Sequence, residues 1–150
     1  MTIELSRLFP VQKPIIGMIH LAGADGSDKV RRALEEVQIY QEEGVDGVIV
    51  EDYHGSGDDV VGTLEAIRKR KFNLVVGVNV LRDPYFGFTY AKKYGAKFVQ
   101  FDSVQTQDLN VPTFNSHREN YQDIAVLGGV GFKYTQKTGN PLDVDLREAK

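Results

Sequence analysis

The chain alternates between short apolar runs and longer segments that carry an apolar stripe. The apolar runs are rich in β-branched residues and lack a strict alternation, which is typical of parallel strands covered on both faces. The longer segments space their apolar residues three and four apart, as on one face of a helix. The predicted strands are 14–20, 47–51, 73–80, 97–102 and 124–133, and the predicted helices are 28–43, 58–71, 83–94, a weaker one at 112–123, and the start of another in the last ten residues.

The order βαβαβαβαβα predicts an α/β fold with a mainly parallel sheet. A doubly wound sheet would need a phosphate-binding turn after the first strand, but HLAGADGSD lacks the GxGxxG spacing. The steady period of about 30 residues per unit therefore favours a TIM-type (β/α)8 barrel. Five strands cannot close such a barrel, so we expect residues 1–150 to be a single incomplete barrel domain, the N-terminal part of a longer one, with an extension at 1–12. A complete chain of this length would be expected to pair its open edges in a homo-oligomer.

Composition narrows the class of partner. The 150 residues are 41% hydrophobic and 26% charged, with a net charge of −3, so a nucleic-acid surface is not expected. No apolar run approaches the roughly 20 residues of a membrane span, and no signal peptide is recognisable at the N-terminus. The absence of cysteine excludes disulfides and thiolate chemistry. We expect a cytoplasmic protein that binds a small molecule rather than a membrane or nucleic acid.

Polar residues occur where the predicted strands end. In parallel β/α folds, ligands bind at the carboxyl ends of the strands. Side-chain alternation places Asn79 on the face opposite Val76, Val78 and Val80, toward the barrel interior. Gln100 shares a face with Asp102 in the same way. The residues that close the five predicted strands are His20, Glu51, Asn79, Asp102 and Lys133.

This set of residues has a definable chemistry. Lys133 could act as a base or Schiff-base nucleophile, and Glu51 and Asp102 as acid and base. The two carboxylates could instead bind a divalent cation such as Mg²⁺. Asn79 could donate to a developing oxyanion, and His20 and Gln100 could contact substrate. The structural alternatives are that His20 only hydrogen-bonds a backbone carbonyl and that Asp102 and Lys133 form an ion pair.

Four segments resemble the BtpA family in order and spacing. They are KPIIGMIHLAG, EEGVDGVIVEDY, VGVNVLRDP and VGFKY, and together they span most of residues 13–134. The resemblance implies a (β/α)8 barrel of about 250 residues. It also places Arg82 at a family-like position, with His20, Glu51, Asn79 and Lys133, and implies that Arg82 contacts substrate. The loops AGADGSD and FDSVQTQD depart from the family pattern.

Two functions follow as hypotheses. The first is an enzyme of the lyase, isomerase or aldolase type, acting on a small sugar-like metabolite with or without a phosphate group. The alternative is a non-catalytic assembly or stability factor, because some members of the family are associated with photosystem I assembly. An assembly factor should expose a large apolar patch on its helix layer.

Overall fold

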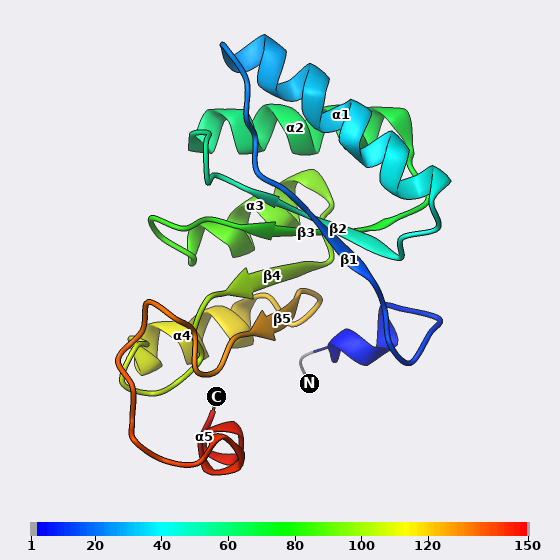
Figure 1. Cartoon of the computed structure of the whole chain (residues 1–150). Coiled ribbons are helices and arrows are strands. Elements are labelled where there is room, and N and C mark those ends of the chain that lie inside the picture. Colours follow the sequence, from blue (N-terminus) through cyan, green and yellow to red (C-terminus); the bar gives the residue numbers. More distant parts are fainter. Residues whose placement is uncertain (1–2, 150) are drawn as a thin grey trace.

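The computed structural model describes residues 3–149 as a parallel sheet covered by helices (Figure 1). Its five strands pair in chain order, β1-β2-β3-β4-β5, and each neighbouring pair is parallel. This is the architecture of consecutive units of a TIM-type β/α barrel, as the sequence predicts. The strands are β1 Ile16–Ile19, β2 Gly47–Glu51, β3 Val75–Asn79, β4 Phe98–Phe101 and β5 Ala125–Gly128, and the helices are α1 Gly26–Glu42, α2 Gly57–Arg70, α3 Phe86–Tyr94, α4 Val111–Asn120 and α5 Leu142–Glu148.

Local side-chain chemistry sets the helix boundaries. Helix α1 begins after Asp25, whose carboxylate accepts the backbone N–H of Asp28, so it starts two residues earlier than predicted. Helix α2 begins with a capping box, in which Ser56 and Asp59 each accept from the other's backbone N–H. Helix α3 ends as predicted at Gly95, whose φ of 87° continues the chain in the left-handed conformation.

The two faces of the sheet carry different cores. The helix-facing side of the strands packs against α1 to α4, and Val78 and Val80 lie on that side as predicted. The opposite face, which we call the inner face, is the side that would line a barrel. Its apolar part is a separate cluster of Phe9, Ile49, Phe98 and Ala125, with Ile16, Met18, Val75 and Leu127 packed against it.

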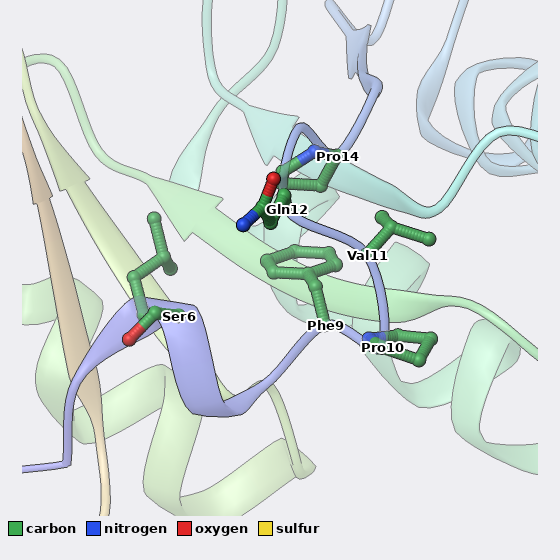
Figure 2. A pocket seen from close by; sticks show the side chains of 7 residues that line it. Ser6, Phe9, Pro10, Val11, Gln12 and Pro14 are labelled. Carbon is green, nitrogen blue, oxygen red and sulfur yellow. The ribbon is translucent and has the colours of Figure 1, made fainter.

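The N-terminal segment closes the amino end of the inner face. A short 3-10 helix, η1 (Leu5–Arg7), is followed by Phe9, whose ring meets that of Phe98 edge to face at a centroid distance of 6.2 Å. The backbone N–H of Ile3 donates to the carbonyl of Gln122. Figure 2 shows Phe9 at the centre of a hollow of about 480 Å³ lined by Pro10, Val11, Gln12 and their neighbours. The described part of the predicted 1–12 extension is therefore folded against the sheet.

Strand β5 is shorter than predicted. It ends at Gly128 rather than continuing to residue 133. The backbone of Gly129 passes so close to the carbonyl oxygen of Asp102 that a Cβ atom would clash with it. Gly131 then adopts a left-handed φ of 70°, which turns the chain out of the sheet. The glycine-rich run is a turn, and the residues beyond it, including Lys133, do not belong to the strand.

Candidate functional site

Four of the predicted residues meet at the carboxyl ends of β1 to β4. The amide nitrogen Nδ2 of Asn79 donates to Glu51 Oε1 at 2.9 Å and to Asp102 Oδ1 at 3.1 Å. The other oxygen of Glu51, Oε2, lies 3.3 Å from His20 Nε2. We call His20, Glu51, Asn79 and Asp102 the strand-end cluster. Its members come from four successive strand ends, so the structure brings together four of the five residues predicted to converge.

Strand register explains the convergence. Glu51 and Asn79 are direct partners in the β2–β3 ladder, so their side chains leave the sheet side by side on one face. Asp102 follows β4 directly, and alternation places it on the same face as Phe98 and Gln100. Asn79 is only 1% exposed, yet its amide is compatible with burial because both neighbouring carboxylates accept from it.

Burial and the neighbouring groups shift the pKa of Glu51. The pKa of Glu51 lies above its ordinary value, chiefly because burial disfavours the carboxylate. The nearby charge of Asp102 raises this pKa further. His20 and the hydrogen bond from Asn79 act in the opposite direction and lower it. The result is a buried carboxyl group that holds its proton more tightly than an exposed glutamate does.

The two hydrogens of the Asn79 amide are both engaged with carboxylates. The amide therefore positions Glu51 and Asp102 with respect to each other. Neither hydrogen is left for a developing oxyanion, so the predicted oxyanion role of Asn79 does not fit this geometry. Within residues 3–149 no group donates a hydrogen bond to its oxygen, Oδ1.

Gln100 lies in β4 on the inner face, two residues before Asp102. Its backbone is paired in register with Leu127 of β5. The side-chain oxygen Oε1 is buried and has no hydrogen-bond partner among the residues that the structure describes. Gln100 therefore adds an unsatisfied acceptor beside the strand-end cluster, and its predicted contact with substrate stays a prediction.

Lys133 and Arg82 lie outside the cluster. The prediction that Lys133 closes the fifth strand is wrong, because β5 ends at Gly128 and the chain has left the sheet before it reaches residue 133. Lys133 is exposed, with its ammonium nitrogen 4.7 Å from the ring centroid of Tyr134. It forms no ion pair with Asp102 in the described structure. Arg82 is exposed and makes no hydrogen bond or ion pair with residues 3–149.

Two further residues at this end of the sheet, Asp52 and Tyr53, were not among the predicted site residues. The carboxylate of Asp52 accepts the backbone N–H of Leu81 at 2.7 Å and so ties the end of β2 to the loop after β3. The ring of Tyr53 is 62% exposed and lies 5.3 Å from the His20 ring, centroid to centroid. Asp52 and Tyr53 are the first two residues after Glu51, so their position just after a predicted strand was the signal that could have identified them.

The donor set for a metal ion is limited. The described residues contain no group of three or more histidine, aspartate or glutamate side chains that could hold a metal ion. Glu51 and Asp102 each direct one oxygen to the same amide nitrogen. A Mg²⁺ ion on these two carboxylates would need further ligands from water or substrate, and it stays a prediction.

The helices were also compared with the length and hydrophobicity that a membrane-spanning helix needs. None of those in the described part of the chain is both long enough and apolar enough to cross a membrane.

Fold and site together define a class. A parallel sheet in chain order, with helices on one face and polar side chains gathered at the strand ends, defines a TIM-type β/α-barrel protein. Within that class, the chain belongs to the BtpA family, whose model matches residues 11–112.

Three relatives place this chain among longer proteins. It is 30% identical to the photosystem I biogenesis protein BtpA of Synechocystis, over 92% of this chain and 58% of that protein. It is similar to uncharacterized proteins of Pyrococcus furiosus (27% identical) and Pyrococcus horikoshii (30% identical), in each case over 59% of this chain and 41% of the relative. The chain thus spans about three fifths or less of the length of these relatives.

Proposed function

We propose that the strand-end cluster is the acid–base centre of an enzyme of the isomerase or lyase type, which acts on a small sugar-like metabolite. The observation that carries the proposal is a series of polar contacts: Asn79 donates to both Glu51 and Asp102, and Glu51 also lies 3.3 Å from His20. Residues far apart in the chain meet there at the end of the sheet where β/α barrels bind ligands.

Two carboxyl groups held by one amide suit proton transfer. The raised pKa of Glu51 favours its protonated form, which can donate a proton to a substrate oxygen. Asp102 is less buried, and as a carboxylate it can accept a proton. Different environments for neighbouring carboxyl groups are a recurring way to separate acid from base. His20, half exposed and in contact with Glu51, can exchange protons between the cluster and water.

Lys133 is not needed in this proposal. An aldolase that uses a Schiff base would require a lysine inside the site, and Lys133 lies in the exposed segment after β5. The proposal therefore keeps the isomerase and lyase types and makes Glu51 and Asp102 the catalytic pair. Binding of substrate by Arg82 and association through the open β1 and β5 edges stay predictions.

Solvent exchange of substrate hydrogens would test this proposal across a panel of candidate compounds. Aldoses, ketoses and their phosphate esters would be incubated with the protein in D₂O and followed by proton NMR. We expect loss of a C–H signal next to a carbonyl group in at least one compound. Glu51→Gln should slow that exchange about 10²-fold or more, because general acid–base catalysis contributes 10²- to 10⁴-fold. Glu65→Gln, on the exposed side of α2, is the matched control. An unchanged rate in Glu51→Gln would remove Glu51 from the mechanism.

A role in the assembly of a protein complex is the second candidate. Its support is the printed name of the Synechocystis relative, a photosystem I biogenesis protein. The expected apolar patch has little support in α1 to α4, since their large exposed apolar residues in the described structure are Ile39 and Phe86, on two different helices. We therefore rank the enzyme first. Co-purification of a stoichiometric protein partner, together with no exchange in any compound, would reverse this order.

A further inference from the structure

We propose that the carboxyl ends of β3 and β4 bind a neutral part of the ligand that carries several hydroxyl groups. Three oxygen atoms would accept from it: Asn79 Oδ1, Gln100 Oε1 and Asp102 Oδ2. The inference rests on the proposed function, because it assigns a ligand class to the same site.

The orientation of Asn79 determines which atoms remain for a ligand. Its nitrogen Nδ2 is occupied by Glu51 Oε1 at 2.9 Å and Asp102 Oδ1 at 3.1 Å. In the part of the chain that the structure describes, no donor reaches Asn79 Oδ1 or Asp102 Oδ2. Asn79 and Asp102 thus present acceptors without hydrogens, and the complementary ligand group is a hydrogen-bond donor.

Gln100 supplies an independent observation. Its Oε1 is buried without a partner among residues 3–149, whereas nearly all buried polar atoms in folded proteins have one. Two of its neighbours on the inner face are apolar, since Phe98 lies two residues before it and Leu127 is its partner in register. Asp102 lies two residues further along the chain on the same face, so a ligand hydroxyl held there would satisfy the oxygen once the Gln100 side chain turns toward it.

The carboxyl groups at the ends of β2 to β4 disfavour the binding of an anion there. Glu51 and Asp102 bring carboxyl groups, and no lysine or arginine side chain contacts either of them within the described residues. Lys133 lies against Tyr134, and Arg82 is exposed. A phosphate or carboxylate next to Asp102 would therefore meet like charge without a compensating cation. A phosphate group on the ligand would have to lie away from β3 and β4.

Tyr53 fits the same ligand class. Its exposed ring stands beside His20, which contacts Glu51. An exposed aromatic ring next to a few fixed polar groups is a common combination in small-molecule sites. The ring offers an apolar surface for the C–H groups of a polyol, while the three acceptors bind its hydroxyls.

Calorimetric titration with paired neutral and anionic compounds tests the inference. The probes are D-ribose, D-glucose and their alditols, each compared with the corresponding aldonate, and inorganic phosphate and MgCl₂. We expect at least one neutral compound to bind, and its aldonate to bind at least tenfold more weakly. Gln100→Leu should weaken the neutral compound at least tenfold and raise the Tm of the ligand-free protein, because it removes the unpartnered oxygen. Gln100→Met, of similar shape, replaces it if the leucine variant does not fold.

A matched control comes from the other end of the inner face. Gln12 is exposed beside the hollow around Phe9 (Figure 2), so Gln12→Leu should leave binding unchanged. The inference is overturned if no neutral compound binds, if aldonates or phosphate bind more tightly, or if Gln12→Leu rather than Gln100→Leu abolishes binding. A Tm shift with Mg²⁺ alone, lost in Gln100→Leu, would overturn it in favour of a cation site.

The two proposals fail separately. Neutral compounds that bind through Gln100 but show no Glu51-dependent exchange would contradict the acid–base function and leave the ligand class standing. A ligand whose hydrogen exchange depends on Glu51, but whose affinity is unchanged in Gln100→Leu, would support the acid–base function and contradict the proposed ligand class. A Gln100→Leu variant with a lowered Tm and unchanged binding would assign Gln100 a structural role only.

Discussion

The inner face of the sheet has two ends, built from the same strands, with opposite chemistry. At the amino end, Phe9 and Phe98 pack edge to face, and Gly77 leaves the space that the Phe98 ring occupies. At the carboxyl end, about two residues further along each strand, the same face carries Glu51 and Asn79 in register. One end is a small apolar core and the other is a buried polar cluster.

The amino end stabilises the folded state, whereas the carboxyl end contains groups whose burial is destabilising. Apolar burial at the amino end is favourable, and among the described residues no buried side-chain nitrogen or oxygen there lacks a partner. The carboxyl end holds a glutamate whose pKa is raised by burial and a glutamine oxygen without a partner in the described structure. Both features are unfavourable in the free protein, and such features concentrate at functional sites.

The largest expected effect is at the apolar end. Phe98→Ala should lower the free energy of unfolding by about 3–5 kcal/mol, because it leaves a cavity beside Phe9 and Gly77. Urea unfolding would measure it. Phe86→Ala is the matched control, since Phe86 is 53% exposed and its loss should cost about 0.5 kcal/mol or less. Similar losses in the two variants would contradict the assignment of a core to this end.

An intermediate effect is expected at the centre of the polar end. Asn79→Leu should lower the free energy of unfolding by about 1–3 kcal/mol, because Glu51 and Asp102 lose their shared donor. The same urea experiment would detect it, with the exposed Asn73→Leu as control. A variant as stable as the wild type would show that the hydrogen bonds from Asn79 to the two carboxylates do not stabilise the fold. Water would then be solvating these carboxylates instead.

The smallest effect concerns pH. The pKa of Glu51 in the native protein lies above its ordinary value of 4.5, so the folded state keeps a proton that the unfolded state releases. The stability of the wild type relative to Glu51→Gln should therefore fall as pH rises from the ordinary pKa through the raised one. Urea midpoints between about pH 4 and about pH 8 would follow this change.

Asp28 provides a control of opposite sign for the pH experiment. Hydrogen bonds from the Ala24 backbone N–H and from Arg31 lower the pKa of Asp28. Its contribution to stability is present above the ordinary pKa of aspartate and is lost as pH falls through the lowered one. The wild type should thus gain stability relative to Asp28→Asn as pH rises. A gain relative to Glu51→Gln as well would mean that pairing with His20 outweighs burial at Glu51.

Much of the fold and part of the site could be predicted from the sequence. Apolar runs and stripes are local patterns, so the strands, the helices and the parallel order followed from them. Alternation along β3 was enough to place Asn79 on the inner face. Because the strands of β/α units are parallel and end at the same edge of the sheet, His20, Glu51 and Asp102 were also predicted to lie at that edge. These conclusions need only the periodicity of strands and the topology of parallel sheets.

Other features were decided by the tertiary structure alone. Lys133 lies outside the site because Gly129 packs against the carbonyl of Asp102 and the chain turns away, a contact between segments distant in sequence. The engagement of Asn79 with two carboxylates and the unpartnered oxygen of Gln100 likewise depend on register between strands. The sequence determined which residues face the barrel interior, because side-chain direction is a local property. Only the assembled sheet decided which of their atoms are paired and which remain for a ligand, because hydrogen bonds depend on distances between strands.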